Sequence, residues 1–415
     1  MTTSLPRQHP RPGSNRRPQA AEVPQAGSAA PAAIVGVRRI FAAESGNFFL
    51  LLGTTLFLVV FGLVMVLSSS AVSSFKSTDD AFTGFLKQGS FAIVGIPLML
   101  LVSRLPAVFW RKWAGTAMMI AVGLQLLVVA TPLGIASGGN RNWLMIGSFS
   151  VQPSELVKVA LVIWLGLVLA KKIDVLGDWR QLIVPIAPVA GASIGFVLLG
   201  QDLGTALILI SMVLGALFFV GVRLRFLAIP VVAMALAGLI LAFATSSRQD
   251  RIQAWMSGCS SDADYSRLCW QTLHGWWALA SGGVFGVGLG NSKAKWSWLP
   301  EADNDFIFAI IGEELGLLGA LVVLGLFIAL GIAFVRIIRA NRDPFARVAV
   351  STVMVWVIGQ AFVNIAVVLG ILPVLGVPLP LISAGGSALI TTLFAIGIVL
   401  SFARQPATTP MEYAR

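Results

Sequence analysis

Long apolar runs alternate with short polar connections along most of the chain. Ten of these runs are about 20 residues long, which is enough for a helix to cross the hydrocarbon core of a bilayer. They lie at roughly 47–68, 85–103, 113–131, 153–170, 181–199, 203–220, 226–245, 305–335, 347–371 and 386–403. The pattern predicts an all-α fold, a polytopic helical bundle in a membrane.

Composition supports this fold class. The 415 residues are 57% hydrophobic and 11% charged, with a mean hydropathy of +0.88. The net charge of +11 comes from lysines and arginines scattered through the connecting loops, unlike the clustered basic surface of a nucleic-acid-binding protein. The chain has no P-loop, zinc-ligand spacing or soluble catalytic domain. We therefore expect membrane lipids around it and no nucleic-acid partner.

The two ends of the chain have a different character. Residues 1–46 are rich in Pro, Ala, Gln and Arg without apolar periodicity, which predicts a disordered tail and no cleaved signal peptide. Residues 404–415 form a second tail. If both tails are cytoplasmic, 20 of the 29 lysines and arginines lie inside and 8 lie in outer loops, as the positive-inside rule favours. The transmembrane domain is then 47–403, with a large outer loop at 246–304.

Acidic residues gather where this outer loop meets the next apolar run, in the stretch WSWLPEADNDFIFAIIGEELGLLG at 296–319. The boundary carboxylates are Glu301, Asp303 and Asp305. Glu313 and Glu314 follow within the run, where a charge costs at least about 2.5 kcal/mol and is a functional candidate. Glu313 lies about 12 Å deeper than Asp305 at 1.5 Å per residue. We therefore predict that Asp305 performs the chemistry and that the deeper pair is structural.

Other outer segments supply further candidates. Arg141 and Trp143 precede the fourth run, and Glu155 and Lys158 share a helix face at its start and can pair. This pair either lines a polar site or only makes an outer helix end soluble. Asp202 is either a helix cap or a member of the site.

The large outer loop has its own features. It contains half of the 12 tryptophans, which fit either an interfacial aromatic belt or a platform for a sugar or lipid head group. Its cations, on the side that the positive-inside rule disfavours, indicate an anionic partner; they are Arg248, Arg251, Lys293 and Lys295. The Gly-rich stretch at 281–290 lacks the βαβ context of a dinucleotide site, so it either lets a ligand approach or folds back under the loop.

The only two cysteines, Cys259 and Cys269, also fall in this loop. An outward placement exposes them to an oxidising compartment, which favours a disulfide over two free thiols. A metal site is disfavoured, because only His274 lies nearby and structural zinc takes four ligands.

Several motifs together resemble the SEDS family (shape, elongation, division and sporulation proteins), and within it the FtsW branch more than the RodA branch. They are NRNW with QPSELVK, QDLGTA, SGGVFGVGLGNS, LPEADNDFIFAIIGEELG and LPVLGVPLPLISAGGS, in family order over about 50–403. Gln201, Ala384 and Asn304 depart from the residues common at their positions, and none of these departures removes a charged candidate.

The resemblance implies a peptidoglycan glycosyltransferase of the bacterial cytoplasmic membrane, which polymerises lipid II at the outer leaflet during cell division. Its implied partners are a class B penicillin-binding protein and other division proteins. Such a transfer needs a base for the attacking hydroxyl and positive charge for the departing pyrophosphate. Asp305 would be the base, and a divalent cation, Mg²⁺ or Mn²⁺, is an optional cofactor. The expected substrate-binding residues are Arg141, Trp143, Glu155, Lys158, Asp202, Lys293, Lys295, Glu301, Ser383, Gly385 and Gly386.

Two other functions compete with this one. A lipid II flippase needs polar residues at the membrane midplane, and the candidates are Glu313, Glu314, Gln360 and Asn364. A non-catalytic division scaffold is the third possibility. The concentration of acids and cations at the outer face favours the polymerase.

Overall fold

A computed structural model describes residues 1–2, 45–137, 140–146, 149–228, 231–232, 255–256, 258–259 and 269–404. Residues Glu44–Arg415 form one compact unit. Its helices are α2 (Gly46–Thr78), α3 (Thr83–Val102), α4 (Ala107–Ala130), α5 (Pro153–Lys171), η1 (Ile173–Val175), α6 (Trp179–Leu199), α7 (Leu203–Val220), α11 (Trp270–Gly282), α12 (Ile307–Ala340), α13 (Pro344–Val368) and α14 (Gly386–Arg404).

Nine helices in the described residues are long and apolar enough to cross a membrane, and they match nine of the ten predicted runs. The helical bundle is thus confirmed. Most of the predicted run at 226–245 lies outside the described residues. The same is true of nearly all of both tails, and of Arg248 and Arg251. Helix α2 continues to Thr78, beyond the predicted end at 68, because its serine-rich last turns pack against neighbouring segments.

The outer segment before α5 contains strands that the apolar pattern does not predict. An antiparallel sheet in the order β1-β2-β3 is formed by β1 (Gly134–Ser137), β2 (Asn140–Ile146) and β3 (Phe149–Val151). Strand β2 packs against the ends of α4 and α5. The sheet is a small addition to the helical bundle.

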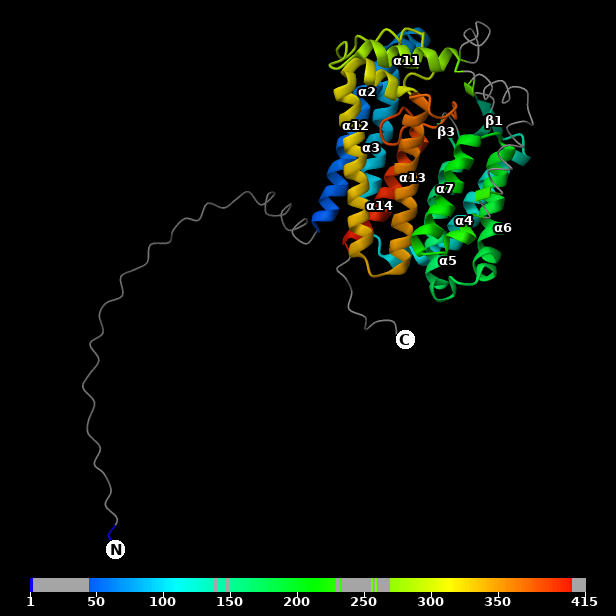
Figure 1. Cartoon of the computed structure of the whole chain (residues 1–415), viewed down its shortest axis with the longest axis vertical. Helices are drawn as coiled ribbons and strands as arrows, with labels where there is room; N and C mark the ends of the chain where they lie inside the picture. The colour runs from blue at the N-terminus through cyan, green and yellow to red at the C-terminus, as the bar shows by residue number, and fades with distance from the viewer. Residues whose placement is uncertain are drawn as a thin grey trace. The chain divides into compact units, whose positions relative to one another are not determined.

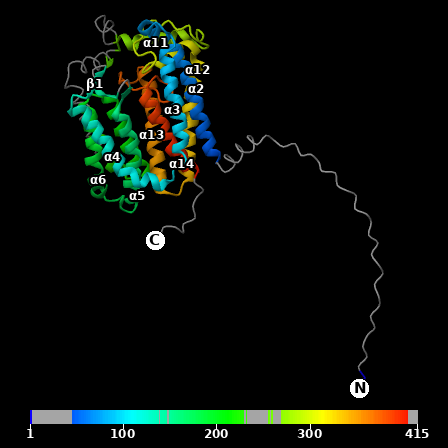
Figure 2. The ribbon, with the colours of Figure 1, turned by 180° about the vertical axis from the view of Figure 1, so that it is seen from behind.

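The central helices are α5, α13 and α14, whose side chains are mostly buried. Helix α13 packs against α5, α7 and α12, and α14 packs against α3. Figures 1 and 2 show α2, α3 and α12 on one side of α13 and α14, and α4 to α7 on the other side, with α11 lying across the ends of α2 and α12. The acidic stretch before α12 therefore lies at one end of the bundle, beside α11.

Helix α12 is interrupted at Gly316, where φ is 68° and ψ is −166°. The Gly-rich stretch after α11 binds the freed backbone groups: Val287 and Gly288 donate to the carbonyls of Glu313 and Glu314 at 2.9 and 3.0 Å. Beyond the break, Leu317 donates to the Gly283 carbonyl at 2.9 Å. A membrane helix can be broken only where such partners exist. Of the two interpretations of this stretch, the structure has the one in which it folds back.

Candidate active site

Asp305 lies two residues before α12, on a segment whose backbone is held by several hydrogen bonds. Each carbonyl of residues 303–305 accepts a hydrogen bond from the last outer turn or from α13. The donors are the Ala384 N–H at 2.8 Å, the Ser383 hydroxyl at 2.7 Å and the Asn364 side-chain amide at 2.8 Å. The Asp305 side chain is half-buried above this fixed backbone.

The surroundings of Asp305 favour its protonated form. Burial, followed by the charges of Glu301, Asp202 and Asp303, raises the pKa of Asp305 from 3.8 to about 7. A carboxyl with this pKa is divided between its two protonation states at neutral pH, which suits a general base. Glu301 itself is exposed and contributes through its charge.

Asp202 both caps a helix and acts on Asp305. Its carboxylate accepts hydrogen bonds from the Thr205 backbone N–H at 2.8 Å and the Thr205 hydroxyl at 2.7 Å, as an N-cap of α7 does. Gln152 donates to the same carboxylate at 3.2 Å. Burial raises the pKa of Asp202, although the Thr205 hydrogen bonds and the Lys158 charge oppose this. The two interpretations of Asp202 are therefore compatible.

Glu155 and Lys158 form an ion pair inside the bundle, at 2.7 Å, with side chains only 5% and 3% exposed. Thr391 donates to the second oxygen of Glu155 at 2.9 Å. The Lys158 ammonium donates to Gln360 at 3.4 Å and lies 4.7 Å from the centre of the Trp356 ring. The pair joins α5 to α13 and α14, so making an outer helix end soluble is not its role.

Arg141 and Trp143 lie on β2. The Arg141 guanidinium donates to the carbonyls of Thr131 at 2.6 Å and Gly134 at 3.2 Å, and its backbone N–H donates to Gly200 at 2.9 Å. These contacts tie the sheet to the end of α4 and to the turn between α6 and α7. Both side chains are half-buried, and their binding of substrate stays a prediction.

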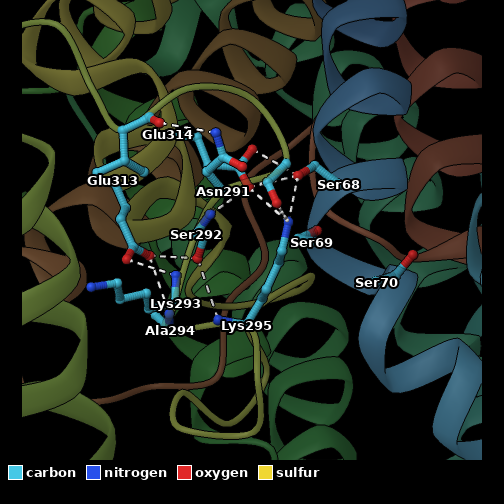
Figure 3. Close-up of polar contacts among 12 residues, drawn as sticks. Ser68, Ser69, Ser70, Asn291, Ser292, Lys293, Ala294, Lys295, Glu313 and Glu314 are labelled. Atoms are coloured by element: carbon cyan, nitrogen blue, oxygen red, sulfur yellow. Dashed lines mark hydrogen bonds and ion pairs between the residues drawn. The ribbon is translucent and has the colours of Figure 1, made fainter.

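Lys295, a predicted substrate-binding residue, has partners within the protein. Its ammonium donates to the Gly290 carbonyl at 2.6 Å, to Glu314 at 3.1 Å and to the Ser68 hydroxyl at 3.2 Å (Figure 3). An ammonium has three N–H groups, so none is left for an anionic substrate. The Lys293 side chain is exposed, in contrast, and only its backbone N–H contacts Glu313.

The last turn before α14 is held by contacts within the protein, and its binding of substrate stays a prediction. The Ser383 hydroxyl is used in fixing the backbone before Asp305 and in accepting a bond from the Leu379 N–H at 2.8 Å. Gly385 donates to the side chain of Gln88 on α3 at 3.0 Å. Gly386 starts α14 where a Cβ atom would lie 2.1 Å from the Phe91 ring. These three residues support the site from within the protein.

Comparison with known proteins identifies the family. The family model described as cell cycle protein, of FtsW, RodA and SpoVE, matches residues 49–408. The chain belongs to this family. The resemblance to SEDS proteins of the FtsW branch is thus confirmed.

Relatives and solved structures of this SEDS family cover most of the chain. The probable peptidoglycan glycosyltransferase FtsW of Mycobacterium tuberculosis is 38% identical over 358 residues, which are 86% of this chain and 68% of that protein. The rod shape determining protein RodA of Thermus thermophilus superposes with a TM-score of 0.63 at 25% identity, covering 86% of this chain and 96% of that one. A second similar structure is titled "Structural coordination of polymerization and crosslinking by a peptidoglycan synthase complex". It superposes with a TM-score of 0.69 at 24% identity, covering 85% of this chain and 96% of that chain, and so has the same fold.

Several residues that support the site in this SEDS protein escape the sequence analysis. Gln88 and Ser68 are absent from the predicted set, and Gln360 and Asn364 enter it only as midplane groups of a transporter. A lone amide or hydroxyl within an apolar run is the available signal, because a buried polar group needs a partner. The sequence does not show that the partner of Asn364 is the backbone at Asp305.

The outer loop contains a disulfide and packed aromatic side chains. Cys259 and Cys269 are joined, while residues 260–268 between them lie outside the described part of the chain. Directly after the disulfide, the Trp270 ring stacks on the Trp298 ring, with 6.0 Å between the ring centres, and the His274 ring lies against both. The disulfide thus adjoins a layer of aromatic side chains beside the acidic segment.

Among the described residues, no group of three or more His, Cys, Asp or Glu could hold a metal ion. The three acids that raise the pKa of Asp305, namely Glu301, Asp202 and Asp303, act through their charges and do not converge with it as ligands. Binding of a Mg²⁺ or Mn²⁺ ion stays a prediction.

Proposed function

We propose that the chain is a peptidoglycan glycosyltransferase that polymerises lipid II into glycan strands at the outer face of the cytoplasmic membrane during cell division. The observation that carries this proposal is Asp305. It combines a pKa of about 7 with a fixed backbone at the boundary of a membrane bundle of the SEDS family. Relatives at 33–38% identity that are named as FtsW glycosyltransferases or as a sporulation protein support the same function.

In the proposed reaction, Asp305 removes the proton from the acceptor sugar hydroxyl as that oxygen bonds to the anomeric carbon of the donor. The bond from this carbon to the polyprenyl pyrophosphate breaks, and the electron pair leaves with the pyrophosphate. Positive charge stabilises this leaving group. Among the predicted cations that the structure describes, Arg141 and Lys293 have at least partly exposed side chains, so we assign them this part. Lys158 and Lys295 act inside the protein.

Membrane placement and partners extend the proposal. Nine apolar spans in the described residues make this a multi-pass membrane protein. We propose that both termini are cytoplasmic, that the chain acts at the division site, and that a class B penicillin-binding protein works beside it. The peptidoglycan synthase complex with a similar fold supports such a partner.

The flippase alternative is less well supported. Transport across a membrane needs polar groups that face a pathway at the midplane. Glu313, Glu314, Gln360 and Asn364 are all buried or nearly so and hydrogen-bonded within the protein, which fits structural roles better. A non-catalytic scaffold would need neither the raised pKa of Asp305 nor its fixed backbone.

The test is polymerisation of purified lipid II by the purified chain, alone and with its class B penicillin-binding protein. Asp305→Asn should abolish glycan strands, and Asp174→Asn, which neutralises an exposed acid on η1, should not. Glycan strands made by Asp305→Asn at the wild-type rate would remove Asp305 as the base. Movement of lipid II across vesicles without polymerisation would favour the flippase.

A further inference from the structure

We propose that Lys295 is a positioning residue for the polymerisation, because it closes the base of the loop that carries Asp305. This inference rests on the proposed function. The base clamp is a set of polar side chains from three segments that meet in Figure 3, namely the half-buried Ser68 on α2, the buried Ser292 and Lys295 after the Gly-rich stretch, and the buried Glu313 and Glu314 on α12.

One half of the base clamp is built around Glu313. Its carboxylate accepts hydrogen bonds from the Ser292 hydroxyl, from the Lys293 backbone N–H at 2.9 Å and from the Ala294 backbone N–H at 3.3 Å. Glu313 is only 2% exposed. A carboxylate that receives these donors holds the incoming chain against α12, since leaving it unpaired in the membrane is costly.

The other half joins Lys295 to Glu314, a residue with no exposed surface. The ion pair is 3.1 Å long, and the Ser68 hydroxyl donates to the two oxygens of Glu314 at 2.6 and 2.7 Å. The Ser68 oxygen in turn accepts from Lys295. Lys295 thus links three segments of the chain, and each of the three N–H groups of its ammonium has an acceptor in them.

Residues 292–314 form a loop whose two ends are held together by the base clamp, and Asp305 lies within this loop. The C-terminal end of the loop is the short first part of α12, which stops at the break at Gly316. The base clamp therefore holds both the start of the loop and the end of this short helix. Outside the clamp, α2 contacts the loop again where Lys76 donates to Ser297 at 2.6 Å.

The ion pair between Lys295 and Glu314 fixes the position of the loop in addition to affecting the stability of the fold. A buried ion pair replaced by apolar residues often leaves stability unchanged, whereas removal of one partner is strongly destabilising. The pair does, however, fix one geometry among its donors. A reacting group displaced by about 1 Å can lose about a hundredfold in rate. Loosening the clamp should therefore affect the rate at Asp305 more than the binding of lipid II.

The experiment compares Lys295→Met, the double variant Lys295→Met/Glu314→Gln and Lys87→Met in full-length protein with its class B partner. Lys87 is an exposed lysine at the same end of the bundle, on α3, and controls for the loss of one charge. We expect kcat for lipid II to fall at least about tenfold in both Lys295 variants, with KM unchanged. We expect thermal stability to drop in the single variant and to recover in the double variant, which has no unpaired buried charge.

Three outcomes would overturn the inference. A higher KM at unchanged kcat would make Lys295 a substrate-binding cation after all. Recovery of wild-type kcat in the double variant would make the pair a stabilising contact only. Hydrogen exchange of residues 296–306 gives a readout that does not depend on catalysis: it should rise in both Lys295 variants relative to Lys87→Met. Unchanged exchange refutes the positioning role, whereas an inactive wild-type protein with raised exchange in the variants refutes only the proposed function.

Discussion

Replacing Asp305 by asparagine should abolish activity and also stabilise the fold, by an amount that depends on pH. The folded protein holds the pKa of this carboxyl at about 7, against 3.8 in the unfolded chain. Between these two values the folded state binds more protons than the unfolded state, so wild-type stability falls as pH rises from about 4 to about 7. Asparagine cannot ionise and avoids this loss.

The size of the effect follows from the pKa difference. A change from 3.8 to about 7 corresponds to roughly 4 kcal/mol at 1.36 kcal/mol per pKa unit, which is an upper value because Asp305 is only half-buried. The gain of Asp305→Asn over wild type should be near zero at pH 4, intermediate at pH 5.5 and complete above pH 8.

Thermal unfolding in detergent between pH 5 and pH 8.5 measures this, with Asp174→Asn as the control for a lost surface charge. The unfolding temperature of Asp305→Asn should exceed that of wild type at pH 8.5 and approach it at pH 5. A constant difference across this range, or a less stable variant at pH 8.5, would show that Asp305 has an ordinary pKa. The same pKa predicts that wild-type polymerisation rises with pH through about 7, and a flat rate would contradict the assignment of the base.

Three further outcomes follow from particular contacts. Gly316→Ala should cost more than about 2 kcal/mol of stability, because its φ is positive and its Cβ would lie 2.4 Å from other backbone atoms, whereas Gly325→Ala has open space and should be neutral or stabilising in the same unfolding assay. Lys158→Met should cost about 3–5 kcal/mol by leaving the buried Glu155 without its cationic partner, and a loss of activity at unchanged stability would instead show that Lys158 serves the substrate. Mass spectrometry after alkylation of unreduced protein should find both cysteines unmodified, and two alkylated cysteines would rule out the disulfide.

The sequence is informative about features that depend on local pattern. Apolar run length predicts the membrane helices because a bilayer requires about 20 apolar residues per span. Asp305 is recognisable because a carboxylate that opens an apolar helix is unusual, and the helix-cap interpretation of Asp202 follows from its position before α7. These properties need only neighbouring residues.

Features that depend on distant residues could not be predicted in this way. Lys295 resembles a free outer cation until its partners on α2 and α12 are known. Ser383 lies in a motif that suggests ligand contact, yet its hydroxyl binds the backbone of residue 304. The sheet of β1 to β3 is not predicted by the apolar pattern, because its strands are only three to seven residues long and their pairing joins different parts of the connection between α4 and α5. Spatial pairing decides each of these cases.

The two sets of contacts around the acidic segment also differ in the order in which a ribosome makes them. Every partner of Glu313 and Glu314 in the base clamp precedes these residues in the chain, so both acids can be paired as soon as they enter the membrane. The side chains that fix the backbone at Asp305 and Asn304 are Asn364 and Ser383, made 59 and 79 residues later. At about 5–20 residues per second, the wait lasts several seconds. A nascent chain can therefore pair the acids inside α12 before the side chains that fix the backbone at Asp305 have been made.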